Sequence, residues 1–180
     1  MPQPVLHTER LRLVPLADEH LELEVELDAD PEVLRYLHGR ARTRDEVLES
    51  HMLRMERGRR VDGLGYWMAF GPGDDFTGLM MLPPWPEAGT AELGYRLPRR
   101  HWRRGFATEV SRELLRHAFE TAGQTRVVAQ TMAVNAGSRA VMEKAGLRYV
   151  RTFDPGLPPI PGSEHGEVEY EMTREDWLLR

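Results

Sequence analysis

The chain has 180 residues, of which 41% are hydrophobic and 29% are charged, as expected of a soluble globular domain with a core of its own. Its net charge of −5 argues against general nucleic-acid binding, and the absence of cysteine excludes disulfides, thiolate metal sites and a cysteine nucleophile. Residues 1–13 lack a secretory signal's apolar segment, and no apolar run approaches the ~20 residues that cross a bilayer. We therefore expect residues 1–180 to form a single cytoplasmic domain that binds neither nucleic acid nor membrane.

The first predicted elements are a strand and a helix. Residues 8–16 alternate between polar and apolar side chains up to Pro15, a pattern typical of a strand that proline ends. Within residues 17–30, Leu21, Leu23, Val25 and Leu27 alternate with polar residues, which favours a strand. Leucine and glutamate are strong helix formers, however, and Asp18 is a suitable N-cap, so we predict a helix here.

Two further helices are predicted before the chain changes its period. Pro31 is typical of the first position of a helix, which would cover residues 30–37. Residues 43–57 form the second helix, since Thr43 is a good N-cap and Glu46, three residues later, completes a capping box.

The middle of the chain has the composition of strands. Residues 65–70 and 76–82 are apolar and flank a glycine- and proline-containing turn at residues 71–75, so they predict a hairpin. A stiff, proline-rich loop at residues 83–89 precedes an alternating run at residues 90–97, which predicts one further antiparallel strand.

The second half of the chain combines helices with strands. Apolar side chains recur every three or four residues in 106–122, which predicts a helix, and residues 135–145 predict another that Gly146 ends. The remaining strands are predicted at residues 126–133, 148–153 and 168–173. This order of elements indicates an α/β fold with a mixed sheet.

A basic turn, residues 101–105, joins the strand at residues 90–97 to the helix at residues 106–122. Gly105 allows close approach of the backbone to an anion, and Arg103 and Arg104 add positive charge. The first N–H groups of a helix have no intrahelical partner, and the helix dipole makes that end partially positive. The turn therefore predicts a phosphate-binding site.

Five segments, taken together and in order, carry a family resemblance. They are residues 8–13, 30–36, 92–95, 102–109 and 135–147. In these segments the chain resembles the GNAT superfamily of acyl-CoA-dependent N-acetyltransferases, and within it the RimJ/RimL-like branch. The resemblance implies a mixed, mostly antiparallel sheet of about seven strands flanked by about four helices, with an acyl-CoA cleft between the fourth and fifth strands. A homodimer is compatible with it.

The resemblance assigns the basic turn and its neighbours to acetyl-CoA, the implied co-substrate. Main-chain N–H groups of the turn would hold the pyrophosphate, and those near Leu97 would meet the thioester carbonyl or the pantetheine. Asn135 would bind the pantetheine or simply cap its helix, and Lys144 would reach the adenosine phosphate or simply suit a helix C-terminus. The residues implied to bind the cofactor are Leu97, Arg103, Arg104, Gly105, Phe106, Ala107, Thr108, Asn135 and Lys144.

The chain departs from the family pattern at three positions. Trp102 stands where the superfamily has Gln or Arg, and Arg103 where the branch usually has Gly, but main-chain phosphate binding survives either change. Met142 stands where many members have a tyrosine general acid, and a thioether cannot donate a proton. The resemblance therefore points to Ser138 as the group that protonates or hydrogen-bonds the leaving thiolate, although a small packed residue is the alternative.

Amide formation requires a neutral amine, whereas a lysine-like amine has a pKa of ~10.4, so a base is needed. Glu92, on the strand beside the predicted cleft, is the candidate, acting directly or through water; a solvated carboxylate is the alternative. Tyr95 would line the acyl pocket or pack as a strand aromatic, and His101 is expected to be solvated. The histidines lack metal-ligand spacing, so we expect no metal.

The acceptor is expected to be a protein N-terminal amine or a small amine, acetylated by direct transfer in a ternary complex. Acidic residues in the first helix and near the last strand would attract a cation, although a solvated charged face also explains them. They are Glu22, Glu24, Glu26, Asp28, Glu164, Glu167 and Glu169, with His165 among them. The alternative to an enzyme is a catalytically silent acyl-CoA-binding module with a sensing or structural role.

Overall fold

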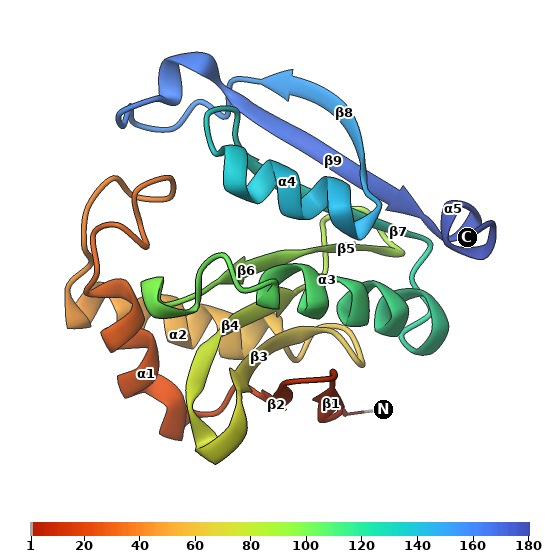
Figure 1. Ribbon diagram of the computed structural model, residues 1–180, viewed down its shortest axis with the longest axis horizontal. Helices are drawn as coiled ribbons and strands as arrows, with labels where there is room; N and C mark the ends of the chain where they lie inside the picture. Colours follow the sequence, from red (N-terminus) through yellow and green to blue (C-terminus); the bar gives the residue numbers. More distant parts are fainter. Residues whose placement is uncertain (1) are drawn as a thin grey trace.

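The computed structural model describes residues 2–180, in which nine strands form two sheets (Figure 1). The first sheet is antiparallel throughout and consists, in spatial order, of β1 (Leu6–His7), β2 (Arg12–Pro15), β3 (Gly65–Phe70), β4 (Phe76–Leu82) and β6 (Gly94–Arg96). The second consists of β5 (Thr90–Glu92), β7 (Arg126–Met132), β9 (Glu167–Thr173) and β8 (Arg148–Phe153), and only β5 and β7 are parallel. This is the mixed, mostly antiparallel arrangement that the sequence predicted.

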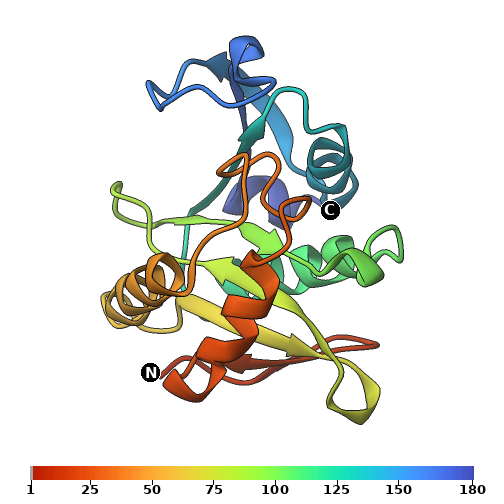
Figure 2. The same cartoon turned by 90° about the vertical axis from the view of Figure 1, so that its left-hand side faces the viewer.

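Helices cover both sides of the sheets, as the view in Figure 2 shows. On one side lie α1 (Leu21–Asp28) and α2 (Arg44–Arg57), and on the other α3 (Phe106–Arg116) and α4 (Ala136–Ala145). A short α5 (Arg174–Leu178) follows the last strand. No helix in the described part of the chain is long and apolar enough to cross a membrane.

Strand alternation divides the apolar core between the two sides. On β3, Trp67 packs in the larger core, which includes Val110 and Leu114 of α3. Its neighbours Tyr66 and Met68 belong to the smaller core beside α1. Full burial of such a side chain stabilises the fold by roughly 1.5–3 kcal/mol. Because alternate side chains of a strand point to opposite sides, each side of the sheet needs helices to cover its own apolar residues.

Several boundaries follow from local signals that the sequence displays. The Thr43 side chain accepts a hydrogen bond from the Glu46 backbone, and Glu46 reaches back to Thr43, which confirms the capping box of α2. Gly146 ends α4 with a positive φ of 101°, as predicted. The helix predicted at residues 106–122 is α3 followed by a π-helical turn at His117–Thr121.

Two local predictions near the N-terminus are wrong. Residues 30–37 form successive turns rather than a helix, because the Arg35 N–H bonds to the carbonyl of Glu32 and interrupts the helical ladder. Asp18 is not an N-cap, since Ala17 precedes a 3₁₀ turn at Asp18–His20 that leads into α1. The predicted strand at residues 8–16 is also divided, into β1 and β2, by a turn that the Thr8 side chain closes on the Leu11 N–H.

The most consequential difference concerns the predicted strand at residues 90–97. It is not one strand, because β5 pairs in parallel with β7 whereas β6 pairs antiparallel with β4. The Leu93 N–H donates to the Val128 carbonyl at 2.7 Å, and beyond this bond the chain leaves β7 and joins the first sheet. The two sheets therefore separate after Leu93, between β6 and the rest of β7.

Candidate active site

The candidate site lies where β6 separates from β7, and the basic turn enters α3 beside it. Arg103 and Gly105 both have positive φ angles, of 58° and 80°. Left-handed residues next to ordinary ones direct successive N–H groups to one side and create a concavity for anions. The Trp102 ring nitrogen donates to the Leu97 carbonyl at 2.8 Å and so ties the turn to the end of β6. Trp102 thus has a structural reason to occupy this position.

The N-terminus of α3 differs from those of α2 and α4. Side chains of Thr43 and Asn135 cap α2 and α4, whereas no described side chain caps α3, whose N-cap is Gly105. The first N–H groups of α3 are consequently left to solvent or to a ligand. Glu109, in the first turn of α3, accepts hydrogen bonds from Thr8 and Arg10, which outweigh burial and lower its pKa.

The side chains beside the turn have distinct roles. Arg103 and Arg104 are both exposed, although the Arg104 guanidinium also lies 3.1 Å from the His101 ring and over the Phe106 ring. The Phe106 ring is buried, so Phe106 could contribute only its main chain. The prediction that His101 is solvated is wrong: its ring is 4% exposed and packs edge-on against Phe106. Burial lowers the pKa of His101, although Asp75, 3.1 Å away, opposes this.

Across the separation, β6 meets the start of α4. The Tyr95 hydroxyl lies 2.9 Å from the Ser138 hydroxyl and also donates to the Ser138 carbonyl at 3.1 Å. Burial raises the pKa of Tyr95 to about 12, despite the hydrogen bond with Ser138, so the phenol is protonated at neutral pH. The structure thus joins two predicted site residues in a hydroxyl pair that the sequence did not indicate.

The other predicted residues of α4 have clear structural contacts. Asn135 accepts from the Ser138 N–H at 3.1 Å and donates to Thr131, so its N-cap role is confirmed. Met142 is 2% exposed and belongs to the core. Lys144 is exposed at the far end of α4, where its carbonyl accepts from Arg112, and its contact with a cofactor stays a prediction.

Glu92 lies on the opposite side of the strand from Tyr95. Ala91, Leu93 and Tyr95 face the α3–α4 core, so alternation directs Glu92 toward α1 and α2. Burial raises the pKa of Glu92, and repulsion from Glu167 adds to the effect, while Arg57 opposes it. The carboxylate is therefore shifted in the direction that suits a proton acceptor working near neutral pH.

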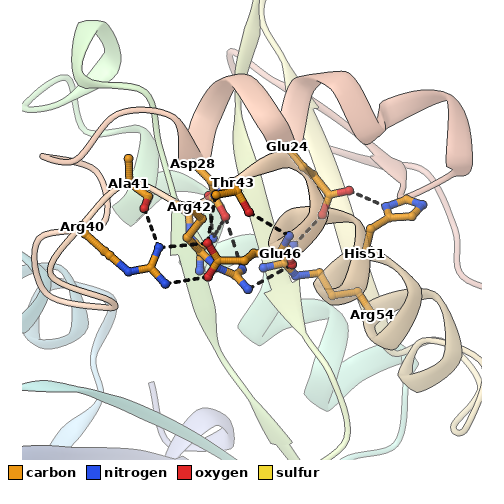
Figure 3. Close-up of polar contacts among 10 residues, drawn as sticks. Glu24, Asp28, Arg40, Ala41, Arg42, Thr43, Glu46, His51 and Arg54 are labelled. Atoms are coloured by element: carbon orange, nitrogen blue, oxygen red, sulfur yellow. Dashed lines mark hydrogen bonds and ion pairs between the residues drawn. The ribbon is translucent and has the colours of Figure 1, made fainter. Parts of the chain in front are cut away.

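The acidic residues predicted to attract a cation separate into different groups. Glu24 and Asp28 are each 1% exposed and contact neighbouring basic side chains (Figure 3). Glu24 pairs with His51 and with Arg54, and the bond to Arg54 is 2.6 Å long. Asp28 accepts two bonds from the Arg96 guanidinium, at 2.7 and 2.9 Å, and lies 3.6 Å from Arg42. These two residues hold α1 to α2 and to β6, so the interpretation of them as a solvated face is wrong.

Similarity to known proteins agrees with this geometry. A family model described as an acetyltransferase (GNAT) domain matches residues 10–148. The chain is 42% identical to an Aspergillus fumigatus protein named FsC-acetyl coenzyme A-N(2)-transacetylase, over 186 residues that cover 98% of this chain and 79% of the relative.

Solved structures share the fold at low identity. RimL, a ribosomal protein alpha-N-acetyltransferase in complex with coenzyme A, has a TM-score of 0.82 at 15% identity and covers 96% of this chain and 99% of its own. Spermidine N-acetyltransferase from Vibrio cholerae, in complex with CoA and spermine, has a TM-score of 0.79 at 15% identity over 94% and 98% of the two chains.

Proposed function

The chain belongs to the GNAT family of acetyltransferases, and we propose that residues 1–180 form one domain of the RimJ/RimL-like type that acetylates a primary amine. The observation that carries the proposal is the separation of β6 from β7 after Leu93. It leaves the Tyr95–Ser138 pair on one side of the sheet and Glu92 on the other. A thioester in this opening would have a proton donor and a proton acceptor on opposite sides.

The turn before α3 fits the pyrophosphate of acetyl-CoA. Its fit rests on the uncapped helix N-terminus, the positive φ angles of Arg103 and Gly105, and the exposed guanidinium of Arg104. A diphosphate would accept hydrogen bonds from the free N–H groups of α3, and the partial positive charge at this end of the helix would stabilise it. Acetyl-CoA, once bound, supplies the acetyl group.

Glu92 acts as the base in the proposed reaction. It accepts a proton from the ammonium of the acceptor, directly or through water, and the neutral nitrogen then attacks the thioester carbonyl carbon. The C–S bond breaks as the new C–N bond is completed, and the second proton lost by the nitrogen passes through water to the departing thiolate, which leaves as the CoA thiol. Ser138 donates a hydrogen bond to the departing sulfur, and the protonated Tyr95 turns its single hydroxyl hydrogen from the Ser138 carbonyl to the Ser138 hydroxyl, 2.9 Å away.

The acceptor is a primary amine on the α1–α2 side of the sheet, where Glu92 lies. The names of the relatives indicate different amines: nitrogen 2 of a compound, a protein α-amine and spermidine. The Aspergillus relative has the higher sequence identity, and its name favours an amine attached to carbon 2. We therefore place small α-amines first among the candidate acceptors, with protein N-termini and polyamines after them.

Thiol release from acetyl-CoA, measured with a panel of amino acid amides, peptides and polyamines, tests the proposal. Wild-type protein should release CoA with at least one amine class, and mass spectrometry should find a product heavier by one acetyl group. Ser138→Ala should slow release by about 10-fold or more, since one hydrogen-bond donor to developing charge is lost. Binding of acetyl-CoA without turnover on any amine would contradict the proposed reaction.

A further inference from the structure

Four carboxylates share the side of the second sheet that faces away from α3 and α4. In the strand register, Glu92 pairs with Val128, which pairs with Glu171 on β9. The same register pairs Gln130 with Glu169 and Met132 with Glu167, and residues two apart on a strand share a face. The row of Glu167, Glu169 and Glu171 therefore begins at Glu171, which lies across β7 from Glu92, and runs to Glu167 opposite Met132, beyond the end of the β5–β7 pairing.

Two of these carboxylates are neutralised by the protein itself. Glu171 accepts from Arg126 at 2.7 Å and pairs with Arg148 at 2.9 Å. Glu169, only 6% exposed, accepts from Gln130 at 2.8 Å and lies 3.6 Å from the guanidinium groups of both Arg126 and Arg151. Arginine side chains of β7 and β8 thus pair with acids on this face.

The other two carboxylates lack such partners. Within residues 2–180, neither Glu92 nor Glu167 forms an ion pair or a side-chain hydrogen bond, although both are partly buried. Burial raises the pKa of both carboxyl groups, and at Glu92 the attraction of Arg57 opposes this while the charge of Glu167 adds to it. A partly buried carboxylate without a counter-ion is unfavourable unless a ligand supplies the cation.

The position of Glu167 suits contact with the remote end of an acceptor. It follows Gly166, whose carbonyl accepts from Ala133 just beyond β7. The loop before it approaches the segment between α1 and α2, because a Cβ atom on Gly39 would lie 3.1 Å from Ile160. Figure 2 shows the loop between α1 and α2 (orange) extending toward the loop before β9 (blue). An amine that reaches Glu92 from this side would pass Glu167.

We propose that Glu167 is a specificity residue that binds a second cationic group of the acceptor while Glu92 receives the proton of the reacting amine. The inference rests on the proposed function and extends it: the preferred acceptors are amines that carry another positive charge. Neither carboxylate then needs an internal partner, because the substrate supplies both cations.

Isothermal titration of CoA-saturated protein with lysinamide and with norleucinamide tests the proposal. These probes share an α-amine and chain length, and only lysinamide has the distal ammonium. We expect lysinamide to bind about 10- to 100-fold more tightly, as a hydrogen bond between charged groups predicts. Glu167→Gln should remove most of this difference. The control Glu164→Gln, three residues away with a side chain 70% exposed, should retain it.

Equal binding of the two amides to the wild-type protein would overturn the inference, as would an undiminished preference in Glu167→Gln. Either result leaves the proposed function intact if CoA binds and acetyl transfer to an amine is detected. Failure of the wild-type protein to bind CoA would instead refute the proposed function itself. Circular dichroism of Glu167→Gln would establish that the variant is folded, since a side chain without internal partners should be dispensable for folding.

Discussion

Buried or partly buried acids occur in two regions of this molecule, and their surroundings are opposite. Between α1 and α2, Glu24 contacts Arg54 and His51, and Asp28 contacts Arg42 and Arg96 (Figure 3). At the opening between the sheets, Glu92 and Glu167 contact none among the described residues. The acids between α1 and α2 are paired within the protein and hold elements together. The acids at the opening would be paired only when a cationic ligand is bound. In these two regions, the acids paired within the protein belong to the scaffold and the unpaired ones lie at the candidate site.

The same contrast applies to helix N-termini. Thr43 satisfies the first N–H groups of α2, and the Glu46 side chain completes the box. The first N–H groups of α3 have only Gly105 before them. A side-chain cap is worth about 1 kcal/mol, so its absence in a helix that packs at the centre of the core is informative. It leaves room for a phosphate group.

The largest expected effect comes from breaking a satisfied group. Asp28→Ala leaves the buried guanidinium of Arg96 without its carboxylate, and unfolding by urea should show a loss of about 3–5 kcal/mol. Glu22→Ala removes an exposed pair with Arg44 and should cost at most about 1 kcal/mol. A loss of less than 1 kcal/mol for Asp28→Ala would mean that the α1–α2 charges are not structural, and the comparison would fail on that side.

Loss of an unsatisfied group should instead affect activity. Glu92→Gln should lower kcat/KM by about 100-fold, or ~2.7 kcal/mol in transition-state stabilisation, because the acceptor loses its base. The variant should unfold at the same urea concentration as the wild type or a higher one. Glu87→Gln, in the exposed loop before β5, is the control for a change of charge. Activity retained within about 3-fold in Glu92→Gln would exclude general base catalysis by this residue.

Local signals predicted much of the scaffold. The capping box of α2 and the glycine that ends α4 are encoded within a few residues, and the structure confirms both. The basic turn could also be predicted, because two arginines, a glycine and the start of an amphipathic helix follow one another directly in the sequence. Alternation at residues 90–97 could not reveal the break after Leu93, since Ala91, Leu93 and Tyr95 face one core whichever sheet they join.

The parts that could not be predicted depend on partners distant in sequence. The Tyr95–Ser138 pair joins residues 43 positions apart, and the Asp28–Arg96 pair joins residues 68 apart. Glu167 and Glu169 look alike in the sequence, and only the placement of Gln130 and Arg151 makes one satisfied and the other not. A charged residue reveals its role only when its neighbours are known.

Gly105→Ala should have an intermediate effect. An L-residue with a φ of 80° is strained by about 1–2 kcal/mol, and the new Cβ atom would lie 3.3 Å from the Arg10 guanidinium. Relaxation of the turn should weaken CoA binding by about 10-fold in calorimetry. Gly73→Ala is a matched control, because its φ is 69° and nothing lies within 4 Å of a Cβ there. Equal CoA affinity in the two variants would show that the turn does not hold the phosphates.

The smallest expected effect compares a satisfied and an unsatisfied carboxylate by the pH dependence of stability. Burial raises the pKa of Glu92 above its ordinary 4.5, so its contribution to stability is present below that pH and is lost as the pH rises through the folded pKa. Hydrogen bonds from Thr8 and Arg10 lower the pKa of Glu109, whose contribution is present above 4.5 and lost as the pH falls.

The free energy of unfolding of the two Gln variants, relative to the wild type, should therefore change in opposite directions between pH 4 and pH 8. Glu92→Gln removes a carboxylate that is costly to ionise in the folded state, so the variant should gain relative stability as the pH rises. Glu109→Gln removes a carboxylate that the protein stabilises in its ionised form, so this variant should lose relative stability over the same range. Parallel changes would show that Glu92 has an internal counter-ion in solution, and the case for a ligand-supplied cation at the cleft would then fail.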